Sequence, residues 1–205
     1  MPLIEGDLMG LFDLKDKTES EEELDRLLES LSVDIGAEKI DYKELTIEQI
    51  DEIPSDELVK AVCVWINGKM DDGEEYGISR TETLKGLPEP CGFVYSIKLL
   101  IDEFEKNGFN KFYENPKNAE YMDFAIEGFR TLGEYDLTEI CERSAEKYKK
   151  LYKKHGEKYF SRFLIDYGNN ALTELDFEFE TIIEKKDLNR ILINYIRGNS
   201  DDFGD

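Results

Sequence analysis

The chain of 205 residues is long enough for one substantial hydrophobic core, and 40% of its residues are apolar, which suffices to fill that core. Its 48 acidic side chains outnumber the 26 basic ones and give a formal net charge of -22, which excludes direct binding to nucleic acid and favours basic partners. Three widely spaced cysteines exclude a disulfide framework and a zinc knuckle, and neither a secretory signal nor a membrane-spanning apolar run is present, so we expect a cytoplasmic protein.

Residues 1–54 are predicted to form an acidic N-terminal extension that is partly helical. Ser20 and Glu23 make a capping-box pattern ahead of four leucines at helical spacing, which predicts a helix with one exposed face. Thr46 and Gln49 repeat this pattern ahead of a short helix that a proline ends. The acids of the first helix are candidates for binding a basic partner: Glu21, Glu22, Glu23, Asp25 and Glu29.

Residues 55–200 are predicted to form an all-helical domain, and residues 201–205 a flexible acidic tail. A helix begins at Ser55 with acids favourably placed in its first turn, and Gly68 is its expected end. The predicted fold class is all-α, a compact bundle of about six to nine helices with little or no β-structure. Apolar side chains at helical spacing predict further helices over residues 91–107, 118–132, 136–155 and 187–196.

The segment between these first helices, residues 69–90, is rich in glycine, proline and charge, which predicts a long surface loop. Its acids lack the spacing of an EF-hand calcium loop, so we expect a solvated surface and no metal site. Long ordered loops often carry function. Four of its acids therefore join the candidate surface for a basic partner: Asp71, Asp72, Glu74 and Glu75.

Two later segments depart from the general pattern. Residues 174–180 alternate acidic and apolar side chains, which suggests a strand but leaves an extended edge or a short helix with mixed faces open. Residues 143–158 carry seven bases, and His155 lies near their end, where a helix C-terminus stabilises positive charge. This basic run is interpreted either as an exposed helix face or as a surface that meets the acidic N-terminal helix.

The sequence offers no pattern for catalysis. No serine lies in a nucleophile motif, and no glycine-rich loop is suited to phosphate binding. No two carboxylates are set apart as an acid and base pair. We therefore expect a protein that is not an enzyme and takes no cofactor.

Residues 105–116 read EKNGFNKFYENP and combine glycine, asparagines and aromatics in one dozen positions. Gly108 is suited to ending the preceding helix, and Phe109, Phe112 and Tyr113 have the spacing of a short following helix. Asn115 and the next proline are expected to stop that second helix. The stretch is thus predicted to be chiefly architectural.

Gly108, Phe109, Phe112 and Asn115 resemble the G-F-x-x-[FY]-[FY]-x-N signature of the bacterial DNA-mimic protein domain, a family typified by an acidic neisserial protein. The resemblance extends from about residue 55 to the last helix. It implies an all-helical protein, often a homodimer, whose acidic side chains stand in place of DNA phosphates and so occupy a DNA-binding protein.

The leading hypothesis is a non-enzymatic acidic binding protein whose partner is a basic protein, such as a DNA-binding protein that it displaces from DNA. An immunity-type inhibitor of a cationic toxin is a second version of the same idea. A different class is a small-molecule binder or an unrecognised hydrolase. That class predicts a deep pocket with buried, unpaired polar groups near Asn107, Asn110, Tyr113 and Asn115.

Overall fold

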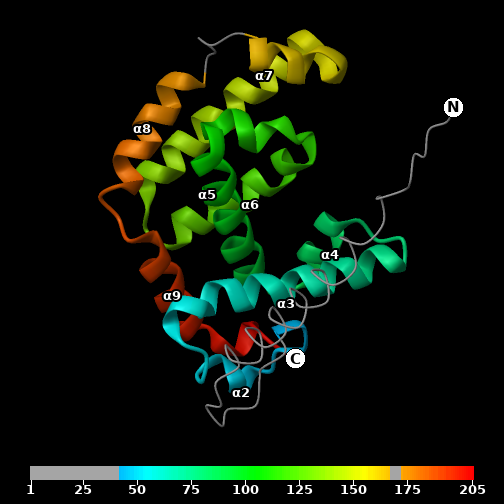
Figure 1. Ribbon diagram of the computed structural model, residues 1–205, viewed down its shortest axis with the longest axis vertical. Helices are drawn as coiled ribbons and strands as arrows, with labels where there is room; N and C mark the ends of the chain where they lie inside the picture. Colours follow the sequence, from blue (N-terminus) through cyan, green and yellow to red (C-terminus); the bar gives the residue numbers. More distant parts are fainter. Residues whose placement is uncertain (1–41, 167–171) are drawn as a thin grey trace, which may run out of the picture. The chain divides into compact units, whose positions relative to one another are not determined.

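A computed structural model describes residues 42–166 and 172–205, so the acidic helix predicted around residues 20–31 lies outside the described part of the chain. Throughout the described residues the regular structure is helical and no strand occurs, which confirms the all-α prediction (Figure 1). The α-helices are α2 (Ile47–Ile50), α3 (Ser55–Glu75), α4 (Arg80–Gly86), α5 (Glu89–Glu114), α6 (Ala119–Thr131), α7 (Tyr135–Asp166), α8 (Thr173–Ile183) and α9 (Leu188–Gly198). The described residues also form three short 3-10 helices, η1 (Tyr42–Glu44), η2 (Pro116–Asn118) and η3 (Ser200–Asp202).

Residues 42–54 are part of the main helical unit, which comprises Ile40–Asp205. Leu45, Ile50 and Ile53 are buried in its core, and each such side chain contributes about 1.5–3 kcal/mol. The Arg197 guanidinium of α9 donates hydrogen bonds to the carbonyl oxygens of Ile50 and Ile53. The compact unit therefore begins earlier than the boundary between residues 54 and 55 that the sequence suggests.

Helix α3 does not end at Gly68 but continues to Glu75, so the prediction of a long loop over residues 69–90 was wrong. Met70 and Gly73 are buried at helical spacing and extend the apolar face of the helix. A Cβ atom at Gly73 would lie 2.1 Å from Thr83 Oγ1, so the glycine is present because α4 packs directly on this turn. Helix α4 begins with a capping box of Ser79 and Glu82, a signal hidden among the loop-like residues.

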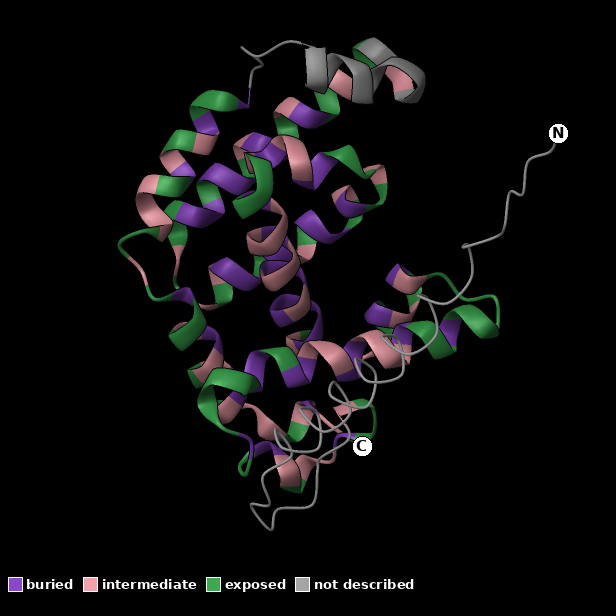
Figure 2. Cartoon of the chain, in the orientation of Figure 1, coloured by how far each residue is buried: buried purple, intermediate pink, exposed green. Residues whose placement is uncertain are grey.

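Helices α5 and α6 lie against each other, and α6 also packs on α7 (Figure 1). Two glycines allow the close approach of α5 and α6. A Cβ at Gly92 would lie 2.7 Å from the Phe124 ring, and one at Gly128 would lie 2.9 Å from the side chains of Phe93 and Ile97. Figure 2 shows that the buried residues gather on the facing sides of these helices.

Residues 174–180, for which a strand was suggested, lie in helix α8. Leu175 and Phe179 are four residues apart and both are fully buried, which is the spacing of one helix face. Phe177 is 72% exposed on the opposite face. The alternation of acidic and apolar residues was misleading because Phe177, which is not part of the buried face, lies between the two buried residues Leu175 and Phe179.

The carboxyl-terminal residues, predicted to form a flexible acidic tail, contact the helical unit. Phe203 is fully buried, and the Asp205 amide donates to the Leu45 carbonyl at 3.0 Å. The Cys91 thiol donates to the Asp202 carbonyl at 3.1 Å, and burial raises the pKa of that thiol to about 12. All three cysteines are free thiols.

Candidate functional site

The segment of residues 107–115, here called the signature junction, contains the break in α5 and the short helical half that follows it. Asn107 and Gly108 have non-helical backbone angles, and Gly108 has φ 65° and ψ -163°, a region that only glycine adopts readily. The Asp176 carboxylate from α8 accepts a hydrogen bond from the Phe109 amide at 2.8 Å. It thereby caps the second half of α5 from another helix. A Cβ at Gly108 would lie 2.6–2.7 Å from that carboxylate. Glycine is therefore required at this position both by the positive φ and by the close approach of Asp176.

The aromatic residues of the signature junction are fully buried. Phe109 lies 5.3 Å from Phe104 and 5.2 Å from Phe179, measured between ring centroids. Tyr113 stacks on Tyr148 at 4.2 Å, and its hydroxyl is 3.0 Å from that of Ser144. Burial strongly raises the pKa of Tyr113, so the phenol stays neutral. These contacts hold α5 against α7 and α8.

The asparagines of the signature junction do not converge on a pocket. Asn115 Oδ1 accepts from the Lys117 amide at 3.1 Å, and Asn107 is exposed. Asn110 Oδ1 is the exception, because it is buried and has no hydrogen-bond partner among the described residues. Neither of the two grooves described below is lined by residues 107–115. This geometry favours the architectural interpretation over a small-molecule or hydrolase site.

The four acids predicted to lie on a loop are instead in the last two turns of α3, and we call them the acidic helix end: Asp71, Asp72, Glu74 and Glu75. Arg80 lies across them from α4. Its guanidinium donates to Asp71, to Glu74 at 3.2 Å, and to Asn67 Oδ1 at 2.6 Å. Although partial burial lowers the pKa of Arg80, the bonds to Asp71 and Glu74 raise it overall. Arg80 thus compensates part of the cluster, and all four carboxylates remain exposed.

A groove of about 460 Å³ lies between α4, α5 and α6, and we call it the α4–α5–α6 groove. Its lining combines four carboxylates, one ammonium group and two phenylalanine rings. Glu127 pairs with Arg130, and Asp123 lies 3.9 Å from Lys149. The lining residues are Thr81, Lys85, Glu89, Phe93, Glu120, Asp123, Phe124 and Glu127.

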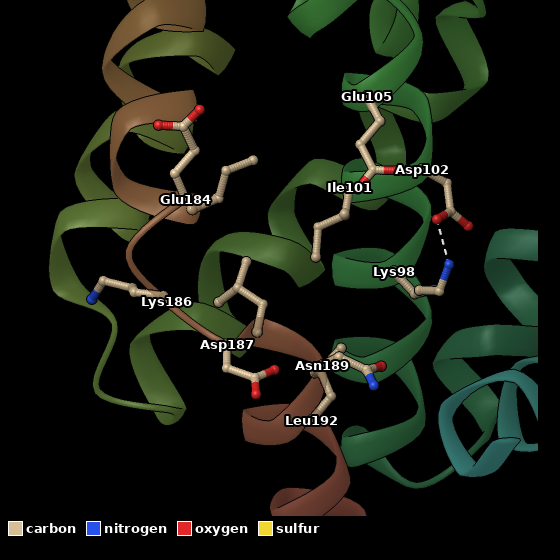
Figure 3. A pocket seen from close by; sticks show the side chains of 11 residues that line it. Lys98, Ile101, Asp102, Glu105, Glu184, Lys186, Asp187, Asn189 and Leu192 are labelled. Atoms are coloured by element: carbon tan, nitrogen blue, oxygen red, sulfur yellow. Dashed lines mark hydrogen bonds and ion pairs between the residues drawn. The ribbon is translucent and has the colours of Figure 1, made fainter. Parts of the chain in front are cut away.

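A second groove of about 510 Å³, the α5–α9 groove, lies between α5 and the end of α8 with the start of α9 (Figure 3). Lys98 pairs with Asp102 along α5, and Asp187 caps α9 by accepting from the Arg190 amide at 2.9 Å. Lys186 pairs with Glu134 outside the groove. The lining residues are Lys98, Ile101, Asp102, Glu105, Ile183, Glu184, Lys186, Asp187, Leu188, Asn189 and Leu192.

The sequence contains a partial signal for the α4–α5–α6 groove. Glu120, Asp123 and Glu127 are spaced as one face of α6, which predicts a continuous acidic stripe. The contributions of α4 and of the start of α5 could not be placed, because the segment before α5 was interpreted as a loop. Only the packing of three helices brings these acids to one groove.

The basic run on α7 forms an exposed helix face where its side chains are described. Lys149, Lys150, Lys153 and Lys154 are exposed, while Tyr148 beneath them is buried. The Arg143 guanidinium pairs with Glu178 of α8 through two hydrogen bonds of 2.6 and 3.0 Å. The side chain of His155 and the N-terminal acids Glu21, Glu22, Glu23, Asp25 and Glu29 lie outside the described part of the structure.

Among the described residues, no helix is both long and apolar enough to cross a membrane. No curated protein and no solved structure matches the chain. Residues 85–199, more than half of the chain, match the family model described as DMP19-like protein. The matched residues include the signature junction and the whole of α5 and α6. The chain therefore belongs to the DMP19-like protein family.

Proposed function

We propose that this protein is a non-enzymatic acidic binding protein that acts as a DNA mimic: it occupies a basic, DNA-binding protein and competes with DNA. Membership of the DMP19-like family is compatible with this role. The formal net charge of -22 supplies the electrostatic attraction for a basic surface. The proposal also includes a cytoplasmic location and assembly as a homodimer.

The observation that carries the proposal is the acidic helix end. The last turn of α3 contains acidic side chains and no base. Negative charge at a helix C-terminus is unfavourable, by about 0.3–1 kcal/mol for each exposed group. Arg80 offsets this cost for Asp71 and Glu74, whereas Asp72 and Glu75 form no ion pair within the described residues and do not stabilise the helix that bears them. Their exposure instead suits them to contact a partner, together with the N-terminal acids predicted from the sequence.

Binding of this kind should depend strongly on salt. A DNA-binding protein has a basic face suited to a duplex that carries one charge in about every 1.7 Å of its axis. Carboxylates that replace the phosphates would release counterions in the same way. Partner binding should therefore weaken steeply as salt rises, and DNA should compete for the same face.

The test is affinity capture from a lysate of the source cells at low and at moderate salt, followed by competition of the captured protein with DNA. We expect a basic protein that elutes as salt rises and that DNA displaces. Recovery of no basic partner at low salt would contradict the proposal. A captured nuclease that loses its activity would support the immunity-type alternative instead.

Variants in the full chain locate the surface. Asp72→Asn with Glu75→Gln removes two exposed carboxylates from the acidic helix end, and we expect weaker capture. Glu139→Gln with Glu180→Gln makes the same change in charge on α7 and α8 and is the matched control. Equal losses in both would mean that only the total charge matters. A third variant neutralises the N-terminal candidates: Glu21, Glu22, Glu23, Asp25 and Glu29.

A further inference from the structure

The α4–α5–α6 groove has an aromatic floor that is held in place by the helix packing. Phe124 of α6 is partly exposed, and a Cβ at Gly92 would lie only 2.7 Å and 2.9 Å from atoms of its ring. The ring therefore lies directly on the backbone of α5 and has little room to move toward it. Phe93 is buried beside it and completes the apolar floor.

The charged rim of this groove is mostly negative. Four carboxylates line it against the single ammonium group of Lys85. Glu89 and Glu120 are exposed and form no ion pair within the described residues. A segment that carries positive charge and some apolar surface is complementary to such a rim and floor.

A third feature of the groove is a polar group without a partner. Thr81 is only 8% exposed and lines the groove, yet its hydroxyl makes no hydrogen bond to any described residue. The hydroxyl is not one of the fully buried unpaired atoms, so it is accessible from the groove and can accept a hydrogen bond from a donor that a ligand brings. An arginine side chain supplies several N–H donors on a planar group that also stacks on aromatic rings.

We propose that the α4–α5–α6 groove binds an arginine-bearing segment of the basic partner, with the guanidinium between the carboxylates of Glu89 and Glu120, the ring of Phe124 and the hydroxyl of Thr81. The inference rests on the proposed function only in that the partner is basic. Arginine is preferred to lysine, because the ammonium group is strongly hydrated and cannot stack. The α5–α9 groove lacks this preference, since its floor is aliphatic and two lysines line it.

The experiment measures binding of fluorescent octa-arginine and octa-lysine peptides to the full chain by anisotropy at physiological salt. We expect octa-arginine to bind more tightly than octa-lysine. The variant Glu89→Gln with Glu120→Gln should weaken octa-arginine binding about threefold to tenfold. Glu105→Gln with Glu184→Gln makes the same change in charge in the α5–α9 groove and should have a smaller effect. Denaturation curves of each variant check that the chain remains folded.

A second variant tests the floor of the groove separately from its charge. Phe124→Leu keeps the carboxylates and should reduce the preference for octa-arginine over octa-lysine about threefold. The inference is overturned if both double variants weaken octa-arginine equally, or if Phe124→Leu leaves the preference unchanged. Neither result depends on capture of a DNA-binding protein. Groove binding without displacement by DNA would instead overturn the DNA-mimic proposal and leave the groove assignment standing.

Discussion

The signature junction and the acidic helix end were both singled out by the sequence, yet their physical situations are opposite. Phe109, Phe112 and Tyr113 are fully buried. The acids of α3 from Asp71 to Glu75 are exposed and lie at the unfavourable end of a helix. The residues that identify the family therefore hold the fold, whereas Asp72 and Glu75, proposed to bind a partner, form no ion pair within the described residues that would stabilise it. Stability and binding should be separable by mutation.

The largest expected effect is at the centre of the signature junction. Phe109→Ala removes a ring that is fully buried between Phe104 and Phe179. The free energy of unfolding should fall by about 3–5 kcal/mol, as measured by urea denaturation. Capture of a basic partner by the remaining folded protein should not change. If Phe109→Ala weakened binding under conditions where the variant is fully folded, the signature junction would contribute to partner binding as well as to stability.

A smaller loss is expected from the junction glycine. Gly108→Ala introduces strain at φ 65° and places a methyl group against the Asp176 carboxylate, so unfolding should become easier by about 1–3 kcal/mol. Gly133→Ala is the matched control, because Gly133 also has a positive φ, of 77°, but nothing lies within 4 Å of the added atom. Equal losses at both glycines would mean that crowding by Asp176 contributes nothing.

Arg80 has both roles, because it stabilises the fold and also neutralises acids of the proposed partner-binding surface. Arg80→Gln removes its bonds to Asp71 and Glu74, and we expect a loss of about 1–2 kcal/mol in thermal or urea unfolding. The same change makes the acidic helix end more negative. Binding of a basic partner should therefore become tighter while stability falls. Parallel losses in both measurements would contradict the separation.

The Asp176 cap predicts a pH dependence of stability. Burial raises the pKa of Asp176, although the Phe109 amide lowers it in part and Glu180 raises it further. A raised pKa in the folded state means that this group favours folding at low pH and loses that contribution as pH rises from its ordinary 3.8 through the raised value. Asp176→Asn keeps an acceptor for Phe109 and should remove this part of the pH dependence. Asp176→Ala loses the titrating carboxyl and also the cap, so it should be less stable than Asp176→Asn by about 0.5–2 kcal/mol at every pH.

The sequence predicted those parts of the fold whose cause lies within a few residues. Gly108 has the positive φ of a helix break, and α9 begins at Leu188, one residue after the predicted start of the last helix. The errors came from distant contacts. Gly73 looked like a loop glycine, but it accommodates Thr83 of another helix. The Asp176 cap on α5 and the groove over Phe124 each require helices separated in sequence, so no local pattern could specify them.

The smallest expected effect on stability comes from single aspartates at the two ends of α3. Asp56 lies in the first turn of α3 and Asp72 in the last turn, and both are exposed aspartates. Asp56→Asn removes a favourable interaction with the helix dipole and should lower the free energy of unfolding by about 0.3–1 kcal/mol. Asp72→Asn should raise it by a similar amount. Urea titrations at low ionic strength measure both, because salt screens the effect.

Binding of the captured partner sharpens this last test. Asp72→Asn should weaken binding even though it stabilises the helix, because stability and partner contact make opposite demands on this carboxylate. Asp56→Asn alters the net charge identically and should affect binding less. If Asp72→Asn stabilises the protein and leaves binding unchanged, the partner contacts another surface. If Asp72 lowers the stability of the protein and still improves binding, its presence is not explained by the fold. That result would identify the acidic helix end as the surface that contacts the partner.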